Sequence, residues 1–180
     1  MTEKELYTLK YPIGEFITPK VITKKDIENW INTIESLPQS IIALTKNLNE
    51  VELKYKYRPQ GWTIQQVVHH CADSHINSLL RFKLTLTEDS PIIKPYLEDK
   101  FAHLIDYNEP IDSSISILIG VHKKLGVLLK SLTEQQLKLE FVHPEHGKRF
   151  SLEETIGIYA WHSNHHVSHI KQALKFKSLY

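Results

Sequence analysis

Cysteine is almost absent from this sequence, which has one in 180 residues, Cys71. A single cysteine excludes an internal disulfide and indicates a reducing compartment. Long apolar runs are also missing, and none approaches the roughly 20 residues that a membrane span needs. The first residues, MTEKELYTLKYPIGEF, carry charges where a signal peptide needs an uninterrupted apolar stretch.

Charge of one sign is not in excess either, because the formal net charge is +1 with histidines neutral. This balance predicts neither a nucleic-acid footprint nor an electrostatic membrane anchor. The apolar share of 41% and the charged share of 24% are ordinary for a soluble globular protein. We therefore expect one cytoplasmic domain over residues 1–180, with neither nucleic acid nor a membrane as its partner.

Helical periodicity and capping signals divide the chain into four long helices. Thr63 and Gln66 form a capping box, in which each side chain bonds the backbone N–H of the other residue, and Ser151 and Glu154 form a second one. The first long helix contains Pro38, which should interrupt or kink it. The four helices are expected over residues 22–48, 63–87, 113–131 and 151–176.

The segments around these helices carry turn residues and no helical period. We expect an extended arm over 1–22, a loop-rich stretch over 88–112 with one short helix at about 97–105, and a loop or small hairpin over 139–150. Four long helices without a βαβ rhythm predict an all-α fold, a four-helix bundle of the up-and-down type.

Histidine is the residue in excess, with eleven in the chain, and four of them fall in the stretch YAWHSNHHVSHIKQ of the last helix. On a helical wheel, His162 and His166 lie beside the apolar stripe, whereas His165 and His169 are rotated towards solvent. Two imidazoles one turn apart can bind the same ion, with zinc–nitrogen distances of about 2.0–2.1 Å. A third ligand then has to come from another helix.

The stretch VVHHCADSH in the second long helix offers that third ligand. His75 falls within the apolar face of this helix. His69 and His70 lie symmetrically on either side of that face, so periodicity does not choose between them. A polar stripe that includes His70, Asp73 and Arg81 either lines a cavity or faces water.

Three blocks of the sequence, YPIGEF, GWTIQQVVHHCADSHINSLLRFKLTLTE and GIYAWHSNHHVSHI, resemble the YfiT-type proteins of the DinB-like superfamily. The resemblance covers nearly the whole chain. It implies a four-helix bundle that forms a homodimer, with a divalent metal ion held by three histidines that correspond to His70, His162 and His166. The family often has a further histidine where this chain has Asn164, which is not a matched ligand position. The expected ion is zinc, with nickel or manganese as alternatives.

An ion on three neutral imidazoles keeps an open coordination position, which is a catalytic arrangement. The resemblance implies a metal-dependent hydrolase with a small-molecule substrate. Asp73, one turn from His70, is then the candidate base, or an acceptor that orients an imidazole. Relatives in the superfamily also resemble S-transferases that use a low-molecular-weight thiol such as bacillithiol, and Arg81 would then meet an anionic end of the thiol. A third hypothesis is a non-enzymatic helical dimer that stores metal or senses pH.

Overall fold

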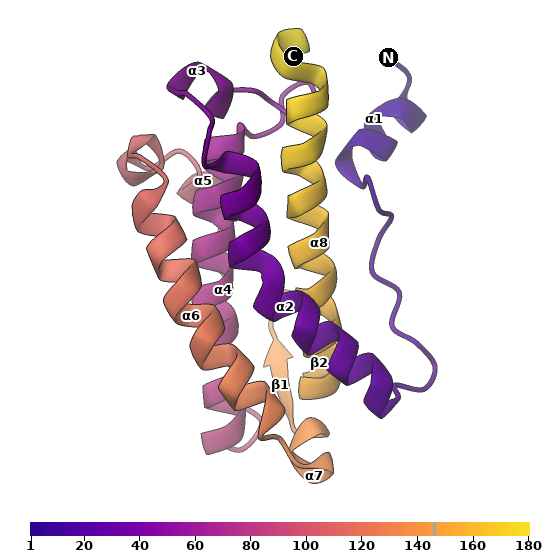
Figure 1. Ribbon diagram of the computed structural model, residues 1–180. Helices are drawn as coiled ribbons and strands as arrows, with labels where there is room; N and C mark the ends of the chain where they lie inside the picture. The colour runs from indigo at the N-terminus through magenta and orange to yellow at the C-terminus, as the bar shows by residue number, and fades with distance from the viewer. Residues whose placement is uncertain (146) are drawn as a thin grey trace.

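The computed structural model describes residues 1–145 and 147–180, and four long helices make up its body (Figure 1). These are α2 (Lys24–Thr45), α4 (Ile64–Thr87), α6 (Asp112–Lys130) and α8 (Leu152–Phe176). The short elements are the helices α1 (Glu3–Lys10), α3 (Glu50–Leu53), α5 (Glu98–Phe101) and α7 (Glu134–Leu137), the 3-10 turns η1 (Ile105–Asn108) and η2 (Lys177–Leu179), and the antiparallel strands β1 (Glu140–His143) and β2 (Lys148–Ser151). The all-α four-helix bundle is confirmed, and of the two alternatives for 139–150, a loop or a small hairpin, strands β1 and β2 form the hairpin, with β2 ending one residue later at Ser151.

The helix directions differ from the up-and-down order that we expected. Just after α4 ends, the N–H of Ile93 donates to the carbonyl of Val142 in β1, at 3.1 Å. Further along, the carbonyl of Ala102 accepts from Nε2 of Gln66, in the first turn of α4, at 3.0 Å. Residues 88–111 therefore return along the whole bundle, so that α4 and α6 run in the same direction (Figure 1). Helical periodicity places each helix in the sequence but says nothing about its direction, which is why the expectation was wrong.

The two predicted helix starts are found where the capping signals lie, with one difference. At α4, Thr63 and Gln66 form the complete capping box. At α8, the Ser151 hydroxyl accepts from the N–H of Glu154, at 3.2 Å, but the reciprocal bond is missing. The Glu154 carboxylate instead accepts from Nζ of Lys148, at 3.0 Å. Strand β2 brings this lysine next to the helix start, so a tertiary contact replaces half of the local one.

Helix α2 runs without interruption through Pro38, although its ribbon bends midway (Figure 1). Proline has no N–H, so the carbonyl of Ile34, four residues earlier, loses its helical donor. Nδ1 of His122, from α6, donates to that carbonyl at 2.6 Å. Because a neighbouring helix satisfies the carbonyl, the proline kinks α2 and does not end it.

The N-terminal arm is only partly extended. Residues Glu3–Lys10 form α1, which begins with a capping box between Thr2 and Glu5. The rest of the arm lies along α8, where Nε1 of Trp161 donates to the carbonyl of Gly14 at 2.9 Å. Expecting an extended arm over all of 1–22 was therefore wrong for α1, whose start signal is a local capping box.

The core has two apolar clusters with a histidine layer between them. On α8, the last buried residue of one cluster is Ala160, and the first buried residue of the other cluster is Ile170. On α4, the corresponding residues are Phe82 and Ala72, and the fully buried His75 lies between them. The polar layer thus crosses the bundle at the height of the histidine-rich stretch. Within the described ranges, no helix is both long enough and apolar enough to cross a membrane.

Candidate metal centre

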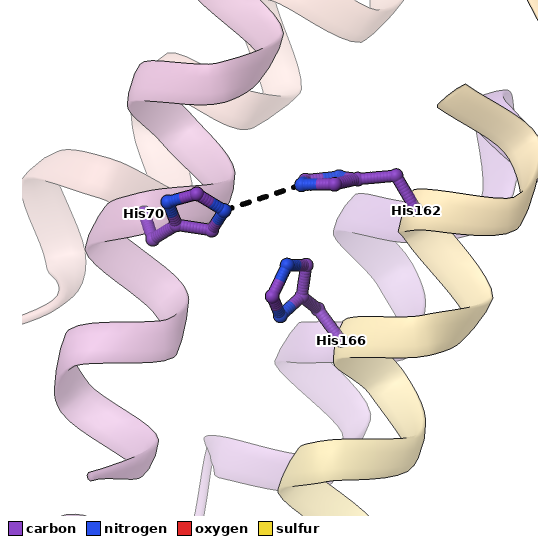
Figure 2. Close-up of side chains that lie close together, drawn as sticks. All are labelled: His70, His162 and His166. Atoms are coloured by element: carbon purple, nitrogen blue, oxygen red, sulfur yellow. Dashed lines mark hydrogen bonds between the residues drawn. The ribbon is translucent and has the colours of Figure 1, made fainter. Parts of the chain in front are cut away.

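Three histidines from two helices turn their rings toward one another inside this layer (Figure 2). His70 comes from α4, whereas His162 and His166 come from α8, one turn apart. Nε2 of His70 lies 3.2 Å from Nε2 of His162. One ring nitrogen from each of the three lies within 4.8 Å of the others. The structure therefore brings together the three residues that the resemblance implied as ligands.

The spacing of these nitrogens suits a tetrahedral ion. With zinc–nitrogen distances of about 2.0–2.1 Å, two ligands of such an ion lie about 3.3 Å apart. The 3.2 Å between His70 and His162 is close to this separation. Imidazole nitrogen is a ligand that suits zinc and nickel. The three side chains fit a divalent ion that prefers nitrogen.

Burial keeps all three imidazoles neutral, as metal ligands must be. Loss of hydration, with a smaller contribution from the nearby His165, lowers the pKa of His70 to about 3. Burial also holds the pKa values of His162 and His166 well below 6.5, with further contributions from the neighbouring histidines. A neutral ring carries a lone pair on one nitrogen and a proton on the other. Which nitrogen carries the lone pair depends on the hydrogen bonds of each ring.

For His166, a chain of contacts decides the tautomer. The carbonyl of Lys10 can only accept, so Nε2–H of His169 donates to it, at 3.0 Å. Nδ1 of His169 then carries a lone pair, which faces Nδ1 of His166 at 3.4 Å. The proton of His166 is thus held on Nδ1, and its Nε2 is left to bind an ion.

His162 has an equivalent partner in His75. Nδ1 of His162 lies 3.2 Å from Nε2 of His75. When that nitrogen of His162 donates its proton to His75, Nε2 of His162 carries the lone pair. This Nε2 faces His70 and the hydroxyl of Ser74, which is 3.4 Å away. In that tautomer, two of the three candidate ligands have histidine partners that turn the correct nitrogen toward the site.

His165 and His169 do not face solvent, contrary to the helical-wheel expectation. His169 is 2% exposed and His165 is 7% exposed. Tyr57 stacks on the ring of His169 with 3.7 Å between centroids, and Trp161 stacks on His165 at 4.5 Å. A helical wheel takes account of one helix alone, whereas in the fold other segments of the chain cover the side of α8 that carries His165 and His169. His165, His166 and His169 also form a second cluster with metal-like spacing, but His169 uses one nitrogen on the Lys10 carbonyl.

The structure separates His69 and Asp73 from the three facing histidines. Nδ1 of His69 lies 2.7 Å from the hydroxyl of Ser114, and its Nε2 lies 3.0 Å from the carbonyl of Glu109. The carboxylate of Asp73 accepts from the hydroxyl of Tyr107, at 2.8 Å. Asp73 therefore stabilises the contact between α4 and η1. Its placement does not support the base role that its sequence position suggested.

A cleft of about 600 Å³ opens beside the histidines. Its lining includes His162 and Ser74 at the histidine end, together with Arg81, Tyr96, Glu98 and Tyr159. A larger groove, of about 830 Å³, lies between the start of α2 and α7, and no histidine lines it. The smaller cleft is therefore the place where a substrate could meet a bound ion.

Glu98 is the carboxylate that sequence reasoning missed. Its Oε2 lies 3.8 Å from Nε2 of His70. Although the Glu98 side chain is 57% exposed, partial loss of hydration raises its pKa, and the neighbouring Asp99 raises it further. The crossover segment brings α5 to this position from 28 residues away in sequence, and no local pattern could have indicated it.

The comparisons with known proteins agree with this geometry. Residues 33–170 match the DinB superfamily. A protein of Halalkalibacterium halodurans is 46% identical over 92% of this chain and 96% of its own length, and one of Oceanobacillus iheyensis is 46% identical over 93% and 97%. Both carry the name "Putative metal-dependent hydrolase". The solved structure of YfiT from Bacillus subtilis superposes on this chain with a TM-score of 0.90. The two sequences are 40% identical, and the match covers 93% of this chain and 97% of YfiT. YfiT is described as "a probable metal-dependent hydrolase with an unusual four-helix bundle topology". The chain belongs to the DinB superfamily.

Proposed function

We infer that this protein is a metal-dependent hydrolase whose divalent ion is bound by His70, His162 and His166. The observation that carries this inference is the convergence of three neutral imidazoles, one of which, His162, lines a cleft. The names of the relatives from Halalkalibacterium and Oceanobacillus support the same activity. Zinc is the ion we propose, with nickel or manganese as alternatives.

The chemistry divides between the ion and the chain. A divalent ion held by these three neutral histidines would keep an open position and would lower the pKa of a water molecule there towards about 7. Glu98, beside His70, is the group that we propose takes up the proton, because its raised pKa makes it a better base than an ordinary carboxylate. Ser74, beside His162, is placed to donate a hydrogen bond to a substrate.

Thiol transfer is the second candidate. It is favoured by Arg81, a cation in the same cleft that would suit an anionic thiol such as bacillithiol. A homodimeric assembly and a cytoplasmic location also remain proposals, and they rest on the family resemblance and on the single cysteine.

The first experiment compares two adjacent histidines. The metal-free protein and its His70→Ala and His69→Ala variants are titrated with cobalt(II), and the visible spectrum is recorded. We expect one cobalt per chain in the wild type, at least 100-fold weaker binding in His70→Ala, and nearly unchanged binding in His69→Ala. His69 is the matched control because it is equally buried and bonds elsewhere. Equal losses in both variants, or two cobalt ions per chain, would contradict the three-histidine site.

The second experiment separates the two activities. Zinc-loaded protein is incubated with a panel of esters and amides, and in parallel with bacillithiol and an electrophile. Hydrolysis that disappears with a chelator and in His70→Ala supports the first candidate. Thiol conjugation without hydrolysis would favour the second.

A further inference from the structure

Arg81 is a half-buried cation with no carboxylate partner among the described residues. Its Nη1 donates to the neutral hydroxyl of Tyr159, at 3.1 Å. Its Nε is buried and has no hydrogen-bond partner in the part of the chain that the structure describes. None of the ion pairs among the described residues includes it. An unpaired charge with an unsatisfied donor costs free energy, so a reason for its place in the fold has to be sought.

The other two arginines of the chain do not line this cleft, although Nε of Arg58 is also buried and has no hydrogen-bond partner among the described residues. Arg58 lies over the ring of Tyr57 and donates to the carbonyl of Pro59, at 3.0 Å. Arg149 pairs with Glu140, at 3.6 Å, on the exposed hairpin. Arg81 differs from both because its guanidinium lines the cleft beside the histidines.

The cleft connects Arg81 with the candidate metal site. Ser74 lies 3.4 Å from Nε2 of His162 at one end, and seven residues of α4 separate it from Arg81, a rise of about 10 Å. Along the facing helix, the ring centroid of Tyr159 lies 6.0 Å from that of His162, and its hydroxyl accepts from Arg81. One wall of the cleft thus runs from the histidines to the guanidinium.

Charges of both signs line the cleft. The carboxylates are Glu98, Asp99 and Glu145, and Lys100 is the second cation. Glu98 is next to His70, where a divalent ion would be its counter-charge. Arg81 has no such counter-charge within the described chain. A planar guanidinium with free N–H groups matches the two oxygens of a carboxylate.

We propose that this cleft binds an elongated carboxylate, with the carboxylate group on Arg81 and the hydroxyl of Tyr159, and with the reactive group at His70, His162 and His166. The proposal rests on the metal site proposed above and gives it a substrate class, a small molecule whose anionic end lies farther along the cleft wall than the ion. The bound carboxylate supplies the counter-charge that Arg81 lacks.

The test uses thiols of graded length as probes, because thiolate bound to cobalt(II) gives an intense near-ultraviolet band. Cobalt-loaded protein is titrated with thioglycolate, 3-mercaptopropionate, 6-mercaptohexanoate and 8-mercaptooctanoate, and with the mercaptoalcohols of equal length. We expect the carboxylate to bind at least tenfold more tightly than the alcohol of equal length for at least one of the four pairs. Only a probe whose length matches the separation between the two ends can reach Arg81 while its sulfur is on the ion.

The variants assign that preference to one side chain. Arg81→Gln should reduce it to twofold or less, with the cobalt spectrum and the affinity for the mercaptoalcohols unchanged. Arg81→Lys, which keeps the charge without the planar fork, should give an intermediate preference. Arg149→Gln is the matched control on the exposed hairpin and should keep the wild-type preference.

Two results would overturn the proposal: equal binding of carboxylate and alcohol at every length, or an undiminished preference in Arg81→Gln. A protein that binds no cobalt would instead contradict the metal site. In that case the metal-free protein is titrated with octanoate and, separately, with octanol. The Nε–Hε resonance of Arg81 is followed by NMR. This resonance is assigned as the one that disappears in the Arg81→Gln variant. A shift with octanoate alone would support a carboxylate site, and no shift with either compound would overturn it.

Discussion

His169 shows how much a single residue outside the ligand set contributes to the candidate site. It accepts from His166 through Nδ1 and donates to the Lys10 carbonyl through Nε2. The tautomer of His166 is therefore decided by a backbone carbonyl in α1. Hydrogen-bond partners of this kind orient a ligand and tune its basicity, and their removal typically weakens metal binding 10–100-fold.

We expect His169→Leu to weaken cobalt(II) binding by about 10–100-fold without changing the stoichiometry. The reason is that His166 loses the acceptor that holds its proton on Nδ1. His169→Asn places an amide oxygen near the former Nδ1 and should retain more of the affinity. Competition with a chelator of known affinity measures both variants. Equal affinities in His169→Leu and the wild type would show that the contact does not orient His166.

At the scale of elements, α2 and α6 are joined by a polar contact inside an apolar interface. Pro38 removes the helical donor for the carbonyl of Ile34, and His122 replaces it. Burial lowers the pKa of His122 to about 4, although the bond to Ile34 opposes the shift. The ring is therefore neutral at pH 7, with its proton on Nδ1. The kink at Pro38 in α2 and the buried His122 in α6 are therefore linked, because the carbonyl that the proline leaves without a helical donor is the one that His122 bonds.

We expect His122→Leu to lower the free energy of unfolding by about 1–3 kcal/mol, because it leaves a buried carbonyl unsatisfied. Pro38→Ala restores an N–H four residues after Ile34. In the double variant, the loss caused by His122→Leu should therefore be smaller than in the wild-type background. Urea unfolding of the four metal-free proteins measures this coupling. Strictly additive effects would mean that His122 stabilises the bundle only by packing.

Over the whole molecule, the buried histidines make stability depend on pH. Burial lowers the pKa values of seven described histidines: His70, His75, His122, His162, His165, His166 and His169. The pKa values of His70 and His169 fall from 6.5 to about 3, and those of His122 and His165 fall to about 4. Below pH 6.5 the unfolded chain binds protons that the folded chain does not bind. Stability is therefore complete above pH 6.5 and is lost as the pH falls below it.

We expect the metal-free protein to unfold between about pH 6 and pH 4, since each of these histidines costs up to about 1.4 kcal/mol per pH unit below 6.5. Helical circular dichroism as a function of pH measures the transition. Zinc at 100-fold its dissociation constant should move the midpoint to lower pH, because an ion that binds only the folded chain adds about 2.7 kcal/mol. A free energy of unfolding that stays constant from pH 6.5 to pH 5 would contradict this account.

Sequence signals that involve residues close together in the chain determined where α4 and α8 begin and that His162 and His166 face inward. The capping box at Thr63 and the half cap at Ser151 begin α4 and α8, because the groups that form a cap lie within four residues of one another. The 3.6-residue period placed His162 and His166 on the inner side of α8, since that period is a property of one helix. The choice of His70 over His69 came from the family resemblance, because the two lie symmetrically about the apolar face.

Other features depend on segments far apart in the sequence, and only the tertiary structure decided them. The crossover of residues 88–111 makes α4 and α6 parallel and brings Glu98 next to His70. The N-terminal arm supplies the carbonyl that orients His169. The periodicity of a single helix cannot predict these contacts, because each contact depends on how two separate elements pack against each other. The sequence by itself thus determined the bundle and its inward-facing histidines, whereas long-range packing decided which groups surround them.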